Sequence, residues 1–188
     1  MADGLARVTE KSLVAVDDGG GRDRRYRLLE TVRLYARERL DEAGEHATLA
    51  GRHARWAVGL AERERESPRL DRDAANLLAA LDTLLASEPR EALRLCLALW
   101  PFWLRRIDLH VAKRRFVEAL AAAPECTALR ADALHAAAAI DYRSGTLSQG
   151  LVLAEESLAA ATAVGDARAE WRALQVLVAD LFRRGDVP

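Results

Sequence analysis

The feature that most constrains the fold of this chain is a four-residue turn signal that recurs at a nearly constant interval between helix-like segments. The three signals are Arg105–Asp108, Arg143–Thr146 and Arg183–Asp186. Their third residues, at positions 107, 145 and 185, are separated by 38 and 40 residues. Self-similarity at a period of about 40 residues is typical of stacked helical hairpins, each of which buries its apolar face only against its neighbours. The sequence therefore predicts an all-α array of antiparallel helical hairpins.

The composition favours helices and indicates no particular partner. Of the 188 residues, 51% are hydrophobic, mostly Ala and Leu, whereas aromatic residues make up 5% and isoleucine occurs only at Ile107 and Ile140. This balance suits helices better than sheets. The formal net charge is −1, from 28 basic and 29 acidic residues, so no overall field attracts nucleic acid or an anionic membrane.

Three further properties of the sequence indicate a cytoplasmic protein. Cys96 and Cys126 form neither a metal-ligand spacing nor a disulfide framework. The residues after Met1 lack the basic and apolar regions of a secretory signal. No stretch reaches the roughly 18 uninterrupted apolar residues that a membrane span needs. We therefore expect a cytoplasmic protein with no membrane partner.

The first 44 residues differ in kind from the rest. The expected elements are a short helix with Leu5, Val8 and Leu13, a strand at 13–16, a glycine-rich loop at 17–23 and a second strand at 26–28. From Glu30 the apolar residues recur at helical spacing, and Gly44 is expected at the C-terminal cap. Helix, two-stranded wing and helix is the order of the closing half of a winged-helix module. Residues 1–44 are therefore predicted to be a winged-helix remnant containing one β-hairpin.

Every segment of residues 45–188 has the pattern of a helix. A helix over 46–66 and a second one, capped by Asp71 and running to Ser87, are expected to form the first hairpin. The later hairpins are in register with the turn signals, and Pro101 is expected to kink its helix. The last hairpin has a first helix but no second one. We therefore predict a tetratricopeptide-like superhelix whose last repeat is incomplete.

An unpaired last helix has a consequence for association. It would leave several large apolar side chains uncovered, more than a soluble monomer usually tolerates as one patch. We therefore expect self-association through residues 168–184, as in a homodimer, or disorder of this segment.

Five stretches of the sequence resemble one bacterial family. They are Thr9–Val14, Tyr26–Ala36, His53–Ala54, Ala75–Asp82 and Leu97–Trp103. The family is that of signal-transduction ATPases with numerous domains, which include LuxR-type transcriptional regulators of actinobacteria, and Tyr26–Ala36 is the most specific match. The resemblance covers nearly the whole chain. It implies a non-catalytic protein-interaction or sensor segment that leads from the NTPase core into tetratricopeptide-like repeats.

The resemblance also implies which partners to expect. In this family the phosphate-binding loop and the Mg-binding carboxylates lie upstream of such a segment, and the DNA-reading helix-turn-helix usually lies downstream. The implied partners are a protein or peptide, a small effector, or the NTPase core of the parent regulator. Binding on the repeat surface would then bias the attached switch domain.

No catalytic, cofactor or metal site is expected. Gly19–Gly21 is not followed by the Lys-Ser/Thr pair of a phosphate-binding loop, and a wing turn is the preferred interpretation. His46 and His53 would lie roughly 10 Å apart on one helix, too far for one metal ion to bridge. Cys96 is expected to be a small core residue. An enzyme with an unrecognised site between helices remains a further hypothesis, in which a polar cavity would hold a ligand.

The expected partner surface combines aromatic and arginine side chains near the turns and on the last helix. Its residues are Trp103, Tyr142, Arg143, Trp171, Phe182 and Arg183. Core packing is at the same time expected for Trp100, Trp103 and Phe116. An exposed Phe102 would be a candidate hot spot, because aromatic anchors dominate many interfaces.

A second hypothesis is that the chain is a DNA-binding regulator that uses the wing. Its basic residues are Arg22, Arg24, Arg25 and Arg27. Reading a DNA sequence needs a recognition helix in the major groove. The remaining candidate for that role, the short helix with Leu5 and Val8, offers only Arg7 and Lys11 as basic residues. A solvated hairpin, or one that docks on a neighbouring acidic domain, is the preferred interpretation. Nucleic acid is therefore not the partner expected for this segment.

Overall fold

The computed structural model describes residues 2–17, 25–106, 108–145 and 147–184. These residues form nine helices and one two-stranded antiparallel sheet, which confirms the all-α prediction. The chain divides into two compact units, residues 1–49 and residues 50–188. The division falls inside a helix, and each unit is described separately below. Among the described residues, no helix combines the length and the apolar content needed to cross a membrane.

The first unit has the predicted order of helix, β-hairpin and helix. Its elements are α1 (Ala2–Glu10), β1 (Val14–Asp17), β2 (Arg25–Leu28) and α2 (Glu30–Glu42). The strands pair antiparallel with Val14 opposite Leu28 and Val16 opposite Tyr26. Leu13 does not belong to the helix as expected, because Ser12 at φ 56° turns the chain out of α1. The loop glycines Gly19–Gly21 lie outside the described residues.

The second helix of this unit ends at the predicted glycine. Gly44 has φ 68°, the left-handed conformation that glycine adopts without strain. Its amide donates to the carbonyl of Asp41 at 3.1 Å, and the Glu45 amide donates to the carbonyl of Leu40 at 2.9 Å. This is the hydrogen-bond pattern that closes many helix C-termini.

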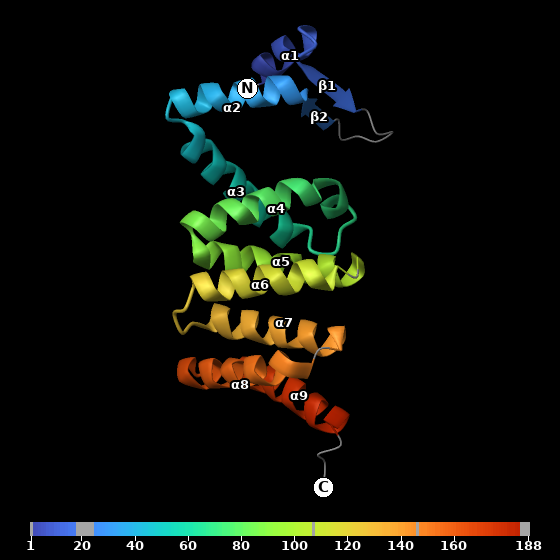
Figure 1. The fold of residues 1–188 in the computed structure, drawn as a ribbon, viewed down its shortest axis with the longest axis vertical. Helices are drawn as coiled ribbons and strands as arrows, with labels where there is room; N and C mark the ends of the chain where they lie inside the picture. The colour runs from blue at the N-terminus through green and yellow to red at the C-terminus, as the bar shows by residue number, and fades with distance from the viewer. Residues whose placement is uncertain (1, 18–24, 107, 146, 185–188) are drawn as a thin grey trace. The chain divides into compact units, whose positions relative to one another are not determined.

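The second unit is a stack of helices joined by short turns. They are α3 (His46–Arg63), whose first residues belong to the first unit, α4 (Arg69–Ser87), α5 (Pro89–Arg106), α6 (Leu109–Ala122), α7 (Ala128–Ser144), α8 (Leu147–Val164) and α9 (Ala167–Arg184). Figure 1 shows α4 to α9 layered in chain order. Helix α5 packs on α7 and α7 packs on α9, so the first helices of successive hairpins lie side by side.

The repeat period is seen directly in the helix starts. Helices α5, α7 and α9 begin at residues 89, 128 and 167, so each start is 39 residues after the previous one. Gly145, at φ 74°, makes the turn between α7 and α8 as predicted. Ile107 and residues 185 and 186, in the first and third turn signals, lie outside the described residues. Helix α9 is the last helix of the described residues.

One local expectation for this unit is corrected by the structure. Asp71 does not cap α4, because the helix begins two residues earlier, at Arg69, whose amide donates to Ser67 Oγ at 3.2 Å. The Asp71 carboxylate instead accepts hydrogen bonds from Arg105 at 2.9 Å and Arg106 at 3.0 Å. These contacts tie the first turn of α4 to the end of α5.

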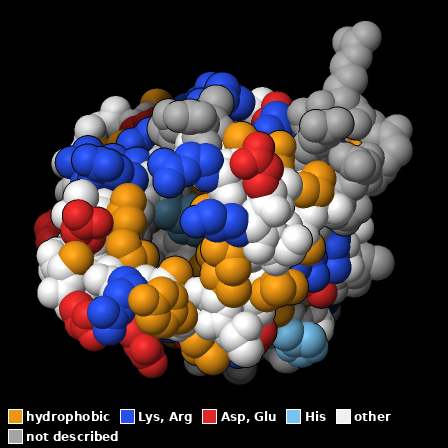
Figure 2. All heavy atoms as spheres, turned by 90° about the horizontal axis from the view of Figure 1, so that it is seen from above, with side chains coloured by type: hydrophobic (Ala, Val, Ile, Leu, Met, Phe, Trp, Pro, Cys, Tyr) orange, Lys and Arg blue, Asp and Glu red, His pale blue; other side chains and the backbone are white. Residues whose placement is uncertain are grey.

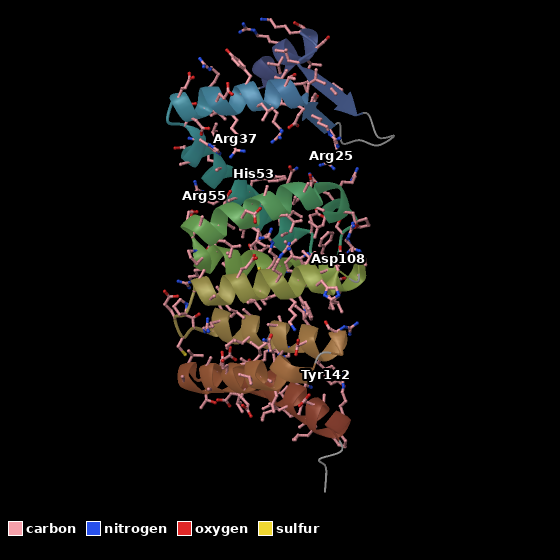
Figure 3. The ribbon with its side chains drawn as sticks, viewed as in Figure 1. Arg25, Arg37, His53, Arg55, Asp108 and Tyr142 are labelled. Atoms are coloured by element: carbon pink, nitrogen blue, oxygen red, sulfur yellow. The ribbon has the colours of Figure 1, made fainter. Side chains whose placement is uncertain are left out.

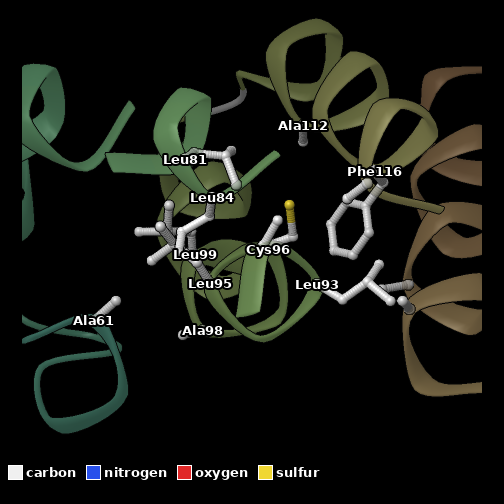
Figure 4. Close-up of a cluster of buried hydrophobic side chains, with 14 of the residues drawn as sticks. Ala61, Leu81, Leu84, Leu93, Leu95, Cys96, Ala98, Leu99, Ala112 and Phe116 are labelled. Carbon is white, nitrogen blue, oxygen red and sulfur yellow. The ribbon is translucent and has the colours of Figure 1, made fainter. Parts of the chain in front are cut away.

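The core of the second unit is filled by leucine, alanine and a few large rings. In Figure 4, Leu81 and Leu84 from α4 approach Leu95 and Leu99 from α5. Trp103 and Phe116, both fully buried, meet edge to face at 6.1 Å between ring centres. Edge-to-face packing is favourable for aromatic rings beyond the area that they bury. The expected core role of Phe116 is therefore confirmed.

One buried carboxylate links three helices. Asp141, on α7, is 0% exposed. It accepts hydrogen bonds from the amides of Gly150 at 2.7 Å and Gln149 at 3.2 Å, in the first turn of α8, and from Lys113 Nζ on α6. The carboxylate therefore compensates free amides at the start of α8, where the helix dipole also favours a negative charge.

Gly150 provides a sharp test of this junction. A Cβ atom at this position would lie 3.3 Å from Asp141 Oδ2 and 3.4 Å from Asp141 Cβ. Asp141 cannot easily move away, because its carboxylate is held by hydrogen bonds. We therefore expect Gly150→Ala to lower the free energy of unfolding by about 1–3 kcal/mol, as overpacking does. Urea denaturation followed by circular dichroism measures this change.

The matched control is Gly51→Ala, in the middle of α3. A Cβ atom at Gly51 would meet only the guanidinium of Arg55, at 3.7 Å or more. The variant should gain about 0.5–1 kcal/mol, because alanine is the better helix former. A Gly150→Ala variant as stable as Gly51→Ala would contradict the account of the junction.

Candidate functional site

A polar hollow of the second unit runs across the first helices of successive hairpins. This inner groove encloses about 360 Å³. It is lined by residues from α3 and the turn that follows it, and from α5, α7 and α9, namely Glu62, Arg65, Arg94, Leu97, Trp100, Leu129, Asp132, His135, Ala136 and Arg172. Residues up to 110 positions apart in sequence meet here because the repeat stacks equivalent helices side by side.

Two ion pairs cross the inner groove from helix to helix. Arg94 on α5 donates to Glu62 on α3 at 2.7 Å and to Glu91 at 2.9 Å. The hydrogen bond to Glu62 is the main reason why the pKa of Arg94 is raised further above its ordinary value. Arg172 on α9 donates to Asp132 on α7. The groove is therefore lined by charged groups that also tie successive hairpins together.

His135 lies half-buried in the wall of the inner groove. Burial lowers the pKa of its imidazole below the ordinary value of 6.5, and the positive charge of Arg172 lowers it further. The buried His135 Nδ1 has no hydrogen-bond partner among the described residues, and the same holds for Arg172 Nε. Buried polar atoms are usually hydrogen-bonded, so two unpartnered ones in one groove make it a candidate binding site.

Trp103, expected on the partner surface, and Phe102, a candidate hot spot if exposed, both lie in the core. Trp103 is 1% exposed and Phe102 is 4% exposed, so neither ring can be an exposed anchor in this structure. Helix α5 is packed between α4, α6 and α7, which leaves little of its circumference for solvent. The Arg105 and Arg106 guanidinium groups cover the Phe102 ring at 5.7 and 5.6 Å from its centre.

Tyr142 and Arg183, both expected on the partner surface, contact each other. Arg183 Nη1 donates to the Tyr142 carbonyl at 2.8 Å, and its guanidinium lies 3.5 Å from the centre of the Tyr142 ring. Figure 3 labels Tyr142 at the C-terminal end of α7, next to α9. Arg143 is exposed beside this pair in the sequence. Two residues of the predicted partner surface therefore form an intramolecular contact that fixes the end of α9 on α7.

The last helix presents an uncovered apolar stripe. Trp171 is 63% exposed and Phe182 is 66% exposed, and between them Leu174, Val178 and Leu181 are exposed as well. At 100° per residue these five positions lie within roughly a third of the helix circumference. We call this stripe the α9 face. Within the described residues, the α9 face is therefore a continuous exposed apolar stripe on a regular helix.

The wing is described only in part. Arg22 and Arg24 lie outside the described residues, whereas Arg25 and Arg27 lie on β2 and, two positions apart, share one side of the strand. Tyr26 and Leu28 occupy the other side and are both exposed. On the face drawn in Figure 2, Lys and Arg side chains lie beside hydrophobic and acidic ones. This mixed surface gives no specific indication of nucleic-acid binding.

The structure assigns no chemical role to the cysteine and metal-ligand candidates of the sequence. Cys96 is fully buried, as predicted, and burial raises the pKa of its thiol far above the ordinary range. A thiol held protonated is a poor nucleophile. Within the described ranges, no group of three or more His, Cys, Asp or Glu side chains is placed to hold a metal ion. Sequence reasoning missed the inner groove because none of its residues forms a local motif.

The fold and these surfaces define a class of protein, an all-α array of stacked helical hairpins with a polar groove along its first helices and an uncovered last helix. The chain is 35% identical, over 193 aligned residues, to the "Putative HTH-type transcriptional regulator Mb0914c" of Mycobacterium bovis and to "Putative HTH-type transcriptional regulator Rv0890c" of Mycobacterium tuberculosis. The alignment covers 93% of this chain, and thus parts of both units, but only 22% of each relative. The chain therefore spans about a fifth of the length of the curated relatives it matches.

Two other comparisons found nothing comparable. No family model matches the chain. No solved structure matches it either.

The environment of His135 leads to a measurable prediction. We expect its titration midpoint, followed by NMR of the imidazole protons, to lie below 6.5 because the site disfavours the charged ring. A folded-state pKa below the unfolded value means that His135 favours folding above pH 6.5, and that this contribution is lost as the pH falls through the folded-state pKa. Arg172→Gln should raise the midpoint, since it removes a nearby positive charge.

Arg114→Gln is the control for this titration. Arg114 lies on α6 and does not line the inner groove, so the variant should leave the His135 midpoint unchanged. A midpoint at or above 6.5 in the unmodified protein would show that the ring is hydrated and that the groove is not built as described.

Proposed function

We propose that this chain is a non-catalytic protein-interaction and sensor segment of an HTH-type transcriptional regulator. The relatives named as such regulators align with 93% of the chain, which supports the regulator part of the proposal. The single observation that carries the interaction part is the α9 face, an ordered helix with large apolar side chains left in contact with water. Such patches usually mark interaction surfaces in soluble proteins.

The finer assignment rests on the residues that resemble signal-transduction ATPases. The helices stack with a 39-residue period, and this supports the proposal that the second unit is tetratricopeptide-like. The order of α1, β1, β2 and α2 supports the winged-helix remnant. In this role the segment works in the cytoplasm and passes a binding event on the helical repeats to the NTPase core of a parent regulator of LuxR type.

For the isolated chain we propose one occupant of the α9 face, a second copy of the same helix. The stripe begins with Trp171 and ends with Phe182, so an antiparallel pair related by two-fold symmetry brings each Trp171 opposite the partner copy's Phe182. Such a contact is self-complementary, as in most homodimers.

Sedimentation velocity tests this proposal. We expect a concentration-dependent monomer–dimer equilibrium for the unmodified chain and a monomer for Trp171→Ser plus Phe182→Ser, because the double variant loses the two most exposed rings of the stripe. Val117→Ser, at a 47% exposed apolar position on α6, is the control and should associate like the unmodified chain. A monomer at all concentrations, or a dimer that survives the double substitution, would overturn the proposed contact.

The second candidate function is DNA binding through the wing. The observation that favours it is that Arg25 and Arg27 share one side of β2, in a chain whose relatives carry the HTH name. Phosphate contacts of this kind would weaken as salt is raised. They would need a recognition helix for specificity, and α1 is short and contains only one arginine, Arg7.

A mobility-shift titration with duplex DNA at low salt separates the two candidates. We expect no shift, because the net charge is −1 and the wing lies beside hydrophobic side chains. DNA binding would instead give a salt-sensitive shift that Arg25→Ala plus Arg27→Ala abolishes and that Arg33→Ala plus Arg37→Ala, with the same change in charge on α2, leaves in place. That second pattern would make the wing a DNA contact.

A further inference from the structure

The inner groove holds one arginine that the neighbouring carboxylates leave unpaired. Three arginines line the groove; Arg94 pairs with Glu62 and Glu91, and Arg172 pairs with Asp132, whereas Arg65 has no ion pair with a described residue. His135 adds no positive charge at neutral pH, because its pKa is lowered from 6.5. The unpaired guanidinium of Arg65 attracts a small anion to the groove.

Two donors of the groove are available to a ligand. Arg172 pairs with Asp132 through Nη2, and its Nε, which is buried, has no hydrogen-bond partner among the described residues. Arg65 is exposed at the groove and has no ion pair or hydrogen bond with any described residue. The unpartnered Nδ1 of His135 can donate a third hydrogen bond when the ring is protonated, because the ring already forms a hydrogen bond with the backbone of Arg172. A carboxylate, with two acceptor oxygens, is the kind of group that such donors bind.

The rest of the lining is apolar and fixed in position. It consists of Leu97, Trp100, Leu129 and Ala136. The Trp100 ring meets Phe116 edge to face at 6.3 Å, and this contact holds one side of the indole against the core. Apolar walls with a few convergent polar groups are the usual construction of small-molecule sites.

From these observations we propose that the inner groove binds a small organic carboxylate, with its oxygens at Arg172 and Arg65 and its apolar body against Trp100. A volume of about 360 Å³ suits a ligand of modest size. A metal ion is excluded as the occupant because Arg94 and Arg172 already engage both carboxylates of the lining. This site is separate from the α9 face, so it goes beyond the proposed interaction function.

Phenylacetate is a suitable probe, since it joins one carboxylate to one flat ring. Its neutral isostere, phenylacetamide, keeps the shape and removes the charge. We expect saturable chemical-shift changes at the ring protons of His135 and Trp100 with phenylacetate, and at least about tenfold weaker binding of the amide, as the loss of a charged hydrogen bond implies. A carboxylate bound nearby should also raise the titration midpoint of His135.

Arg65→Gln and Arg172→Gln should each weaken phenylacetate binding by about tenfold or more. Arg65 is exposed and forms no ion pair with a described residue, so its variant keeps the fold, and thermal melting verifies this for both variants. Arg114→Gln, a 64% exposed position outside the groove, is the matched control and should bind like the unmodified chain. No saturable shift with phenylacetate, equal affinity for the amide, or unchanged affinity in Arg65→Gln and Arg172→Gln would overturn the proposal.

The phenylacetate experiment and the sedimentation experiment test the two proposals independently. Sedimentation of the unmodified chain reports the α9 face whether or not an anion binds in the groove. Phenylacetate binding without self-association would support the groove alone, and self-association without phenylacetate binding would overturn the groove alone.

Discussion

The helical stack depends on one interaction, the contact of the buried Asp141 carboxylate with Lys113 and with the first turn of α8. A carboxylate removed from water is costly unless charge and hydrogen bonds compensate it, and here a lysine, two amides and a helix N-terminus do so. The contact fixes α6, α7 and α8 relative to one another. Asp132 lies nine residues earlier on α7, which at 100° per residue is the opposite side of the helix. Anchoring one side of α7 on α8 therefore positions the other side in the inner groove.

The parts of this fold that sequence reasoning predicted are those encoded locally. The period of the turn signals predicted the stack of hairpins, and Gly44 and Gly145 were predicted to end helices because glycine alone adopts φ near 70° without strain. The contacts that sequence reasoning missed join residues that are far apart along the chain or lie on different helices. Asp141 bonds to amides eight and nine residues on, and Asp71 bonds to arginines 34 and 35 residues on. A carboxylate that bonds across helices has the same local pattern as one on a solvated surface, so no signal distinguishes them.

The same distinction explains the candidate sites. Trp103 was expected on the partner surface and is buried, whereas Trp171 was expected there and is exposed, although both are tryptophans on amphipathic helices. The difference lies in the neighbours, because α4, α6 and α7 cover α5, whereas among the described helices α9 packs mainly on α7 and α8. The groove residues were missed for a related reason. They are single positions on separate helices, and only the stacking of equivalent helices brings them together.

The last helix connects the two surfaces that this structure singles out. Arg172 extends into the inner groove, and the adjacent residue Trp171 belongs to the α9 face, so one rigid helix carries a residue of each. Its far end is clamped on α7 by Arg183 and Tyr142, and its near end begins at Asp166, whose carboxylate accepts the Arg168 and Ala169 amides at 3.1 and 3.0 Å. A helix held at both ends moves as a unit. If an anion in the groove changes the position of Arg172, it changes the α9 face by the same displacement, and occupation of that face must act on the groove with the same free energy.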